Sequence, residues 1–236
     1  IIDIKEKNMK TEDIVKELKR KYTEKIFTTV NNEKTVEIIN ACFEADSSYL
    51  LRRPNADYIA REINWYESQS LNVNDIQDGA PAIWQKVSSD NGYINSNYGY
   101  LLHSDENHNQ YDNVVHALLN DKHSRQAIAI YTRPTMHSDS TQYGMHDFCC
   151  TNTVQYLYRD GELNAIVSMR SNDAVFGYNN DIAWQQHVLT KLCSDLHLTP
   201  GKIYWNAGSL HVYERHFNLL GEDNDSDSQH TLPNIQ

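Results

Sequence analysis

Positive charge is in short supply in this chain of 236 residues. It has 21 lysines and arginines against 32 aspartates and glutamates, which gives a formal net charge of −11 at pH 7. Nonspecific binding to nucleic acids depends on a basic surface that neutralises phosphate groups, so this composition argues against direct binding of DNA or RNA. A small phosphorylated ligand is compatible with it, because a few local arginines are enough to hold one phosphate.

Long apolar runs and metal-binding cysteine patterns are also missing. No run reaches the length of about 18 apolar residues that a membrane-spanning helix needs, and the charged N-terminus lacks the apolar segment of a signal peptide. The spacing of Cys42, Cys149, Cys150 and Cys193 fits neither a zinc site nor a disulfide framework. We therefore expect free thiols, no metal, no membrane contact and a cytoplasmic protein.

The chain length fits one domain, which we place at residues 9–220, and no internal repeat interrupts it. Residues 1–8 precede Met9 and are interpreted as a tag or an upstream extension. Residues 221–236 form a polar, acidic tail that we expect to be mobile.

The hydrophobic periodicity predicts both helices and strands. Helices are expected at residues 11–22, 55–68 and 181–196. Strands are expected at residues 34–43, 127–131, 154–158, 165–169 and 203–206. Thr11 is expected to cap the first helix, Asp160-Gly161 to form a hairpin turn, and Thr199-Pro200-Gly201 to turn the chain after the last helix. Since these elements do not alternate regularly, the expected class is α+β.

Three segments carry the candidate chemistry. They are Asp147-Phe-Cys-Cys-Thr-Asn-Thr-Val-Gln155, Met169-Arg-Ser-Asn-Asp-Ala-Val-Phe-Gly-Tyr-Asn-Asn-Asp-Ile-Ala183 and Gly208-Ser-Leu-His-Val-Tyr-Glu-Arg-His216. Their order and spacing resemble the thymidylate synthase family. That family has a nucleophilic Cys five residues before a Gln, then Arg-Ser-x-Asp, then Leu-Gly-x-x-x-Asn-Ile-Ala, then His-x-Tyr. The resemblance covers roughly residues 35–217 and is strongest to the deoxycytidylate hydroxymethylases of phages.

The resemblance implies a fold, a co-substrate and a partner. The fold would be a thymidylate synthase-like mixed sheet packed with helices, and one sheet face would form a homodimer interface. The substrates would be dCMP and 5,10-methylenetetrahydrofolate, and the two subunits would share the phosphate sites. A phage-encoded chain of this kind would work in the host cytoplasm.

Cys150 is the candidate nucleophile. A thiolate that adds to C6 of a pyrimidine breaks the conjugation of the ring and makes C5 nucleophilic, and a thiolate is also a good leaving group near neutral pH. A cysteine in a strand is more often a small buried apolar residue, and the surrounding motif reverses that expectation. Strand alternation would point the neighbouring Cys149 to the opposite face, where we expect it to pack.

The resemblance also implies the residues that hold the nucleotide and the folate. On the nucleotide it implies Arg170 at the phosphate, Arg125 reaching across the dimer, Ser171, Asn152 and Gln155 in the substrate site, His211 and Tyr213 at the ribose, and Tyr98 near the base. On the folate it implies Asp173, Gly177 and Trp84. The family has a second arginine where this chain has Gln126, and its N-terminal phosphate arginine has no match; Lys34 and Arg133 are possible substitutes.

Asp181 is expected to choose the base, because thymidylate synthases have Asn at this position. An Asn amide suits O4 and N3–H of uracil, whereas a carboxyl group accepts from the cytosine amine and can hold a proton on N3. Without the motif, Asp181 would be interpreted as the N-cap of its helix. Glu62 matches a glutamate that orders water, and its position near the apolar face of a helix predicts burial and a raised pKa.

We therefore expect a deoxycytidylate 5-hydroxymethyltransferase, in which Cys150, Glu62 and Asp181 are catalytic and water adds to the one-carbon unit. Three alternatives stay open. One is a dCMP 5-methyltransferase of the same fold, in which the hydride of the folate arrives before water. Another is a dUMP enzyme, which Asp181 disfavours. The third is a catalytically silent nucleotide-binding homologue, which Gln126 would fit but Cys150 and Arg170 would not.

Overall fold

The computed structural model describes residues 9–30 and 32–221. The expected extension at residues 1–8 and the tail after Gly221 lie outside this part of the chain. The helices are α1 Thr11–Thr23, α2 Ala56–Glu67, α3 Ala82–Val87, α4 Tyr98–His103, α5 Gln110–Asn120, α6 Met136–Asp139, α7 Gly177–Leu196 and α8 Asn218–Gly221. The strands are β1 Thr28–Val30, β2 Glu33–Glu44, β3 Ile128–Ile130, β4 Thr151–Arg159, β5 Glu162–Met169, β6 Asn172–Asp173 and β7 Thr199–Tyr213.

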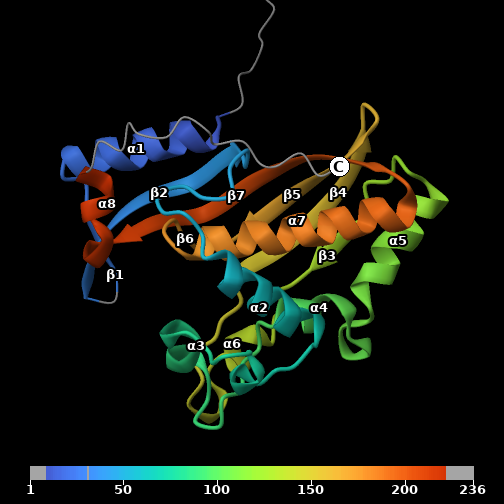
Figure 1. Ribbon diagram of the computed structural model, residues 1–236, viewed down its shortest axis with the longest axis horizontal. Coiled ribbons are helices and arrows are strands. Elements are labelled where there is room, and N and C mark those ends of the chain that lie inside the picture. Colours follow the sequence, from blue (N-terminus) through green and yellow to red (C-terminus); the bar gives the residue numbers. More distant parts are fainter. Residues whose placement is uncertain (1–8, 31, 222–236) are drawn as a thin grey trace, which may run out of the picture.

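These strands form one mixed sheet in the order β1-β2-β7-β5-β4-β3, with β6 beside β7 (Figure 1). The β5–β7 and β6–β7 pairs are parallel and the remaining pairs are antiparallel. The expected α+β class with a mixed sheet is confirmed. The β4–β5 turn is confirmed as well: Asp160 and Gly161 both have positive φ, at 52° and 89°, as a tight hairpin turn of primed type requires.

The long helix α7 crosses one face of the sheet and packs on β5 and β7 (Figure 1). Alternate residues of β5 and of the first half of β7 are buried, among them Val167 and Trp205, and the Trp205 ring meets that of Tyr178 in α7. The residues between them on β4 and β5, such as Leu157 and Ile166, are only half-buried on the opposite face. The sheet is therefore covered by helices on one side.

A second layer of short helices lies beyond α7, where α4 packs against α2. A Cβ atom at Gly99 of α4 would lie 1.8 Å from the carbonyl oxygen of Tyr66, so only glycine allows this approach. Asn97 caps α4 by accepting from the N–H of Tyr100, and its amide also donates to the carbonyl oxygens of Trp65 and Ser70. These contacts fix Tyr98 at the start of α4.

Three sequence-based expectations are wrong in detail. Lys10 is the N-cap of α1, and the Thr11 hydroxyl donates instead to Asp46 at 2.6 Å. Residues 199–201 belong to β7, because α7 already ends at Leu196 and His197 makes the turn with a φ of 54°. The helix α7 begins four residues earlier than expected, which changes the interpretation of Asp181. No described helix has the length and apolar character needed to cross a membrane.

Candidate functional site

The predicted catalytic residues converge where β4 begins, β5 ends and α7 starts (Figure 1). Cys150 directly precedes β4 and Arg170 directly follows β5, and the N–H of Arg170 donates to the carbonyl oxygen of Cys150 at 2.9 Å. Asp181 lies in the first turns of α7, close enough to Cys150 to affect its pKa. Segments that are far apart in the sequence therefore meet at one site.

Arg170 is fixed beside the thiol of Cys150. Its Nε donates to the carbonyl oxygen of Cys149 at 2.9 Å, one Nη donates to that of Phe148 at 2.5 Å, and the same Nη lies 3.6 Å from the Cys150 sulfur. The Phe148 ring lies 4.9 Å from the guanidinium carbon. Burial raises the pKa of the Cys150 thiol to about 11, while Arg170 acts to lower it. The site thus holds a thiol whose deprotonation a neighbouring cation favours.

Cys149 is fully buried, and its sulfur lies 3.2 Å from the carbonyl oxygen of Thr151. Burial raises its pKa well above that of a free thiol. Both cysteines precede β4, which begins at Thr151, so strand alternation is not what separates them. They nevertheless differ as expected in exposure, because Cys150 is only partly buried.

Asp181 is the fifth residue of α7, and the N-cap of this helix is Phe176. The interpretation of Asp181 as a helix cap is therefore wrong. The amide of Asn172 donates to Oδ2 of Asp181 at 2.7 Å. The pKa of Asp181 is raised to about 8, chiefly by burial and then by the nearby Glu62, against the lowering effect of hydrogen bonds from Tyr98 and Asn172. Asp181 is thus mainly a neutral acid at pH 7.

Glu62 is 3% exposed, and burial raises its pKa. The expected burial and the direction of the pKa shift are confirmed. The hydroxyl of Tyr58 donates to Oε1 of Glu62 at 2.5 Å, and the indole N–H of Trp84 donates to the same oxygen at 2.8 Å. Sequence reasoning missed Tyr58, although its position one helical turn before Glu62 is a signal for a shared helix face.

Asp147 is a second residue that sequence reasoning left without a role. Its carboxylate is 6% exposed and accepts three hydrogen bonds, from the N–H groups of Asn95 and Ser96 at 2.7 and 2.8 Å and from the Ser96 hydroxyl at 2.5 Å. It therefore joins the segment before Cys150 to the segment before Tyr98. The sequence feature that could have indicated a role for Asp147 is its position as the first residue of the cysteine motif.

Asp173 and His211 lie side by side in the parallel pair of β6 and β7. The Asp173 carboxylate accepts from the N–H groups of Val175 and Phe176, so it holds the turn into α7. Gly177 starts α7, and a Cβ there would lie 3.3 Å from that of Asp173.

The rings of His211 and Tyr213 are adjacent, with centroids 4.8 Å apart, as their two-residue spacing on one strand predicts. Burial lowers the pKa of His211, which is 7% exposed. The hydroxyl of Ser209 lies 3.3 Å from Nδ1 of His211 and donates to Glu37 at 2.5 Å. Neither Ser209 nor Glu37 was predicted from the sequence.

The other predicted binding residues lie on β4 and directly after Arg170. Gln155 lies five residues along β4, and its amide donates to the carbonyl oxygen of Arg125 at 2.8 Å. Asn152 is the second residue of β4, and its carbonyl oxygen accepts from the N–H of Tyr131. Ser171 directly follows Arg170.

The two possible substitutes for the missing phosphate arginine have other ion pairs. Lys34 lies 3.5 Å from Glu214, and Arg133 lies 2.9 Å from Asp139. Of the residues considered for the phosphate, Arg170 is therefore the one that lies next to Cys150 of the same chain.

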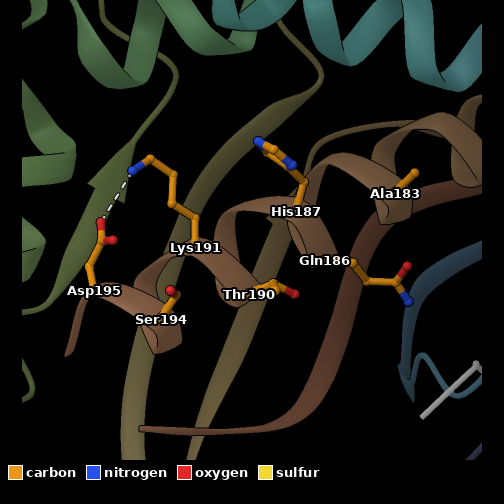
Figure 2. Close-up of a pocket in the computed structure, with 7 residues that line it drawn as sticks. All are labelled: Ala183, Gln186, His187, Thr190, Lys191, Ser194 and Asp195. Carbon is orange, nitrogen blue, oxygen red and sulfur yellow. Dashed lines mark hydrogen bonds and ion pairs between the residues drawn. The ribbon is translucent and has the colours of Figure 1, made fainter. Parts of the chain in front are cut away.

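A surface hollow of about 420 Å³ lies along α7 and contains none of the predicted site residues (Figure 2). It is lined by Ala183, Gln186, His187, Thr190, Lys191, Ser194 and Asp195. Lys191 pairs there with Asp195 at 3.1 Å (Figure 2). Within residues 9–30 and 32–221, no group of three or more His, Cys, Asp or Glu side chains is arranged to hold a metal ion.

Comparisons with known proteins agree with this geometry. The family model described as thymidylate synthase matches residues 11–236. The deoxycytidylate 5-hydroxymethyltransferase of Enterobacteria phage T4 is 53% identical over 194 residues, which cover 79% of each chain. Thymidylate synthase 1 of Bacillus amyloliquefaciens is 29% identical over 168 residues, which cover 68% of this chain and 70% of that protein.

The fold is also similar to a solved structure, the thermostable thymidylate synthase A from Bacillus subtilis. The TM-score is 0.65 at 22% identity, and the match covers 81% of this chain and 72% of that one. At this identity the likeness concerns the fold, and the family follows from the match of the family model and from the phage relative. The chain belongs to the thymidylate synthase family.

Proposed function

We propose that this protein is a deoxycytidylate 5-hydroxymethyltransferase that transfers a one-carbon unit from 5,10-methylenetetrahydrofolate to C5 of dCMP. The observation that carries the proposal is Asp181, a partly buried acid beside Cys150 at the position where the family reads the base. The phage relative, which is named for this reaction, supports the same substrate.

The protonation state of Asp181 suits cytosine. As a neutral acid it donates its proton to N3, which is an acceptor in cytosine, and its other oxygen accepts from the exocyclic amine. Because its pKa is about 8, the acid is a stronger donor than an amide and can deliver the proton completely during the reaction. Arg170, with exposed guanidinium surface beside the sulfur, is suited to the phosphate.

The first step joins the Cys150 sulfur to C6 of the base. The electrons of the C5–C6 double bond move to form a C4–C5 double bond, and those of the C4–N3 double bond move to N3, which takes the proton of Asp181. C5 then forms a bond to the methylene carbon of the folate, and one of the two bonds from that carbon to nitrogen breaks. Loss of the C5 proton and departure of tetrahydrofolate leave an exocyclic methylene group, to which water adds before the sulfur leaves C6.

Glu62 is assigned to the water that completes the reaction. Both Tyr58 and Trp84 donate to its Oε1, so we assign Oε2 to the attacking water. A carboxyl group with a raised pKa is a better base than an ordinary glutamate once it is ionised. Trp84, Asp173 and Gly177 would lie on the folate side of the site, and His211 and Tyr213 at the ribose.

A homodimer is part of the proposal. Among residues 9–30 and 32–221, no helix covers one face of β4 and β5, and half-buried apolar residues such as Leu157 and Ile166 lie on it. A twofold pairing of these faces would bury them. Arg125, which lies before the edge strand β3, would then reach the phosphate in the partner's site.

Release of tritium from C5-labelled dCMP in the presence of methylenetetrahydrofolate tests the proposal, because the label leaves only if the base is activated and transferred. The mass of the product then separates hydroxymethyl-dCMP, which is heavier by one oxygen atom, from methyl-dCMP. No tritium release from dCMP under conditions that support release from dUMP would contradict the assignment of the substrate.

A further inference from the structure

A neutral carboxyl group at position 181 does not by itself select cytosine. With its proton on one oxygen it complements cytosine, which accepts at N3 and donates at the 4-amine. With the proton on the other oxygen it complements uracil, which donates at N3 and accepts at O4. The choice of base therefore depends on which oxygen of Asp181 carries the proton.

Tyr98 also hydrogen-bonds to Asp181, but its hydroxyl can donate or accept, so the neighbour whose nitrogen acts only as a donor is Asn172. Its Nδ2 donates to Oδ2 of Asp181 at 2.7 Å. An oxygen that accepts this bond cannot also direct a proton along the same line, so the donor from Asn172 favours Oδ2 as the carbonyl oxygen and leaves the proton on Oδ1. This effect of Asn172 on the proton of Asp181 requires no net charge, because it depends only on the direction of one hydrogen bond.

The burial of Asn172 supports a role beyond packing. The residue is 3% exposed, and its Oδ1 has no hydrogen-bond partner among the described residues. A buried amide oxygen left without a partner costs stability, and an apolar side chain would avoid that cost. The Nδ2 of this amide donates to Asp181.

The backbone holds Asn172 firmly in place. The residue lies in β6, where it pairs in parallel with Leu210 of β7. The carboxylate of the following residue, Asp173, accepts from backbone N–H groups at the start of α7. The distance between Asn172 and Asp181 is therefore set by the sheet and the helix start rather than by a mobile loop.

We propose that Asn172 is a specificity-determining positioning residue, which fixes Oδ2 of Asp181 as the acceptor for the cytosine amine and Oδ1 as the proton donor to N3. This inference rests on the proposed dCMP reaction and deepens it, because it assigns the discrimination against dUMP to a pair of residues. The raised pKa of Asp181, which keeps the acid neutral, is consistent with it.

The main test replaces Asn172 by serine, whose hydroxyl can both donate and accept and so does not fix the proton. We expect the ratio of kcat/KM for dCMP to that for dUMP, measured by tritium release, to fall about tenfold, which corresponds to one mismatched buried hydrogen bond. The value of kcat/KM for dCMP should also stop rising with pH at a higher pH than in the wild type, because loss of a hydrogen-bond donor raises the pKa of Asp181.

Asn179 provides a matched control. It is also 3% exposed and its Oδ1 is also unpaired among the described residues, but its amide donates to the carbonyl oxygens of Arg52 and Val175. Asn179→Ser should lower the melting temperature and leave the dCMP to dUMP ratio unchanged. An equal change of the ratio in both variants would overturn the proposal.

A second variant covers the case in which Asn172→Ser does not fold. The double substitution Asn172→Asp with Asp181→Asn exchanges donor and acceptor within the pair at nearly constant shape. The new carboxylate would orient the amide at 181 to donate towards O4, so the double variant should prefer dUMP more strongly than Asp181→Asn alone. Equal preference for dUMP in the double variant and in Asp181→Asn would contradict the proposed role of Asn172.

Calorimetric binding of dCMP and dUMP separates this inference from the proposed function. Failure of the wild-type protein to release tritium from dCMP would reject the reaction. In that case, loss of the preference for binding dCMP over dUMP in Asn172→Ser would still support the role of Asn172. An unchanged preference in a folded Asn172→Ser variant would reject that role, whatever reaction the protein catalyses.

Discussion

At the scale of single residues, the two neighbouring cysteines have different surroundings. Cys150 is partly exposed beside Arg170, whereas Cys149 is fully buried against a backbone carbonyl. A nucleophile must reach the substrate, and a buried thiol with a strongly raised pKa does not. The difference supports the proposal that Cys150 takes the covalent step.

Cys150→Ala should abolish tritium release from dCMP, and Cys149→Ala should retain most of it. The Cys149 substitution removes a buried sulfur and should lower the stability by about 1 kcal/mol. Tritium release and thermal unfolding of both variants check this. Near-normal turnover in Cys150→Ala would reject the proposed covalent intermediate.

Asp181→Asn should move preference from dCMP towards dUMP by about ten- to hundredfold in kcat/KM, because an amide cannot give up the proton that N3 of cytosine needs. Since Asp181 lies inside α7 and is not its cap, the start of the helix should be unaffected. The ratio of kcat/KM for the two nucleotides in wild type and variant is the measurement. An unchanged ratio would remove the main support for the choice of dCMP.

The pH dependence gives the same substitution a second readout. With a Cys150 thiol of pKa about 11, kcat/KM for dCMP should rise with pH as the thiolate fraction grows, and it should level off near pH 8, where Asp181 loses its proton. In Asp181→Asn the dUMP reaction should continue to rise above pH 8. A break at the same pH in both proteins would show that another group titrates there.

At the scale of elements, two loops are joined by one buried carboxylate. Asp147 precedes the nucleophile and accepts three hydrogen bonds from Asn95 and Ser96, which lead into α4 and Tyr98. The loop before β4 and the start of α4 are therefore fixed relative to each other. The positions of Cys150 and Tyr98 depend on that connection.

Asp147→Asn should destabilise the protein by about 1–3 kcal/mol, because a neutral amide oxygen binds the N–H groups of Asn95 and Ser96 more weakly than a carboxylate does, and the hydrogen bond with the Ser96 hydroxyl must reverse. It should also lower kcat about tenfold or more, since small displacements of reacting groups are costly. The matched control is Asp75→Asn, whose exposed carboxylate accepts from Ser70. Equal effects of the two substitutions on kcat would argue against a positioning role for Asp147.

At the scale of the whole molecule, the chain places one proposed phosphate arginine, Arg170, next to the proposed nucleophile Cys150. Arg125 lies with Gln155 towards the sheet edge, and Lys34 and Arg133 have ion pairs elsewhere. A phosphate commonly takes more than one cationic partner. A site completed by Arg125 of a second copy agrees with the sheet face that carries no helix.

Mixing Arg125→Ala with Cys150→Ala subunits should therefore restore activity. Random exchange gives heterodimers with one complete site, so about a quarter of the wild-type activity is expected. Tritium release after confirmed subunit exchange is the measurement. Recovery that stays at the level of the separate variants, despite exchange, would contradict a shared phosphate site.

The sequence by itself determined the family and the pairing of His211 with Tyr213, and it singled out Cys150 as the nucleophile that we propose. These follow from short spacings, because neighbours in a strand or one helical turn keep a fixed relation in any tertiary structure. The burial of Glu62 followed from the same kind of pattern. The hairpin at Asp160-Gly161 was predictable because its backbone conformation depends on those two residues.

Only the tertiary structure decided the protonation of Asp181 and its partners. The pKa of this acid depends on burial and on Glu62, Tyr98 and Asn172, which come from three different parts of the chain. Asp147 meets Asn95 and Ser96 across about 50 residues of sequence. No local pattern encodes such contacts, because proton affinity and burial are sums over groups that folding brings together from distant segments.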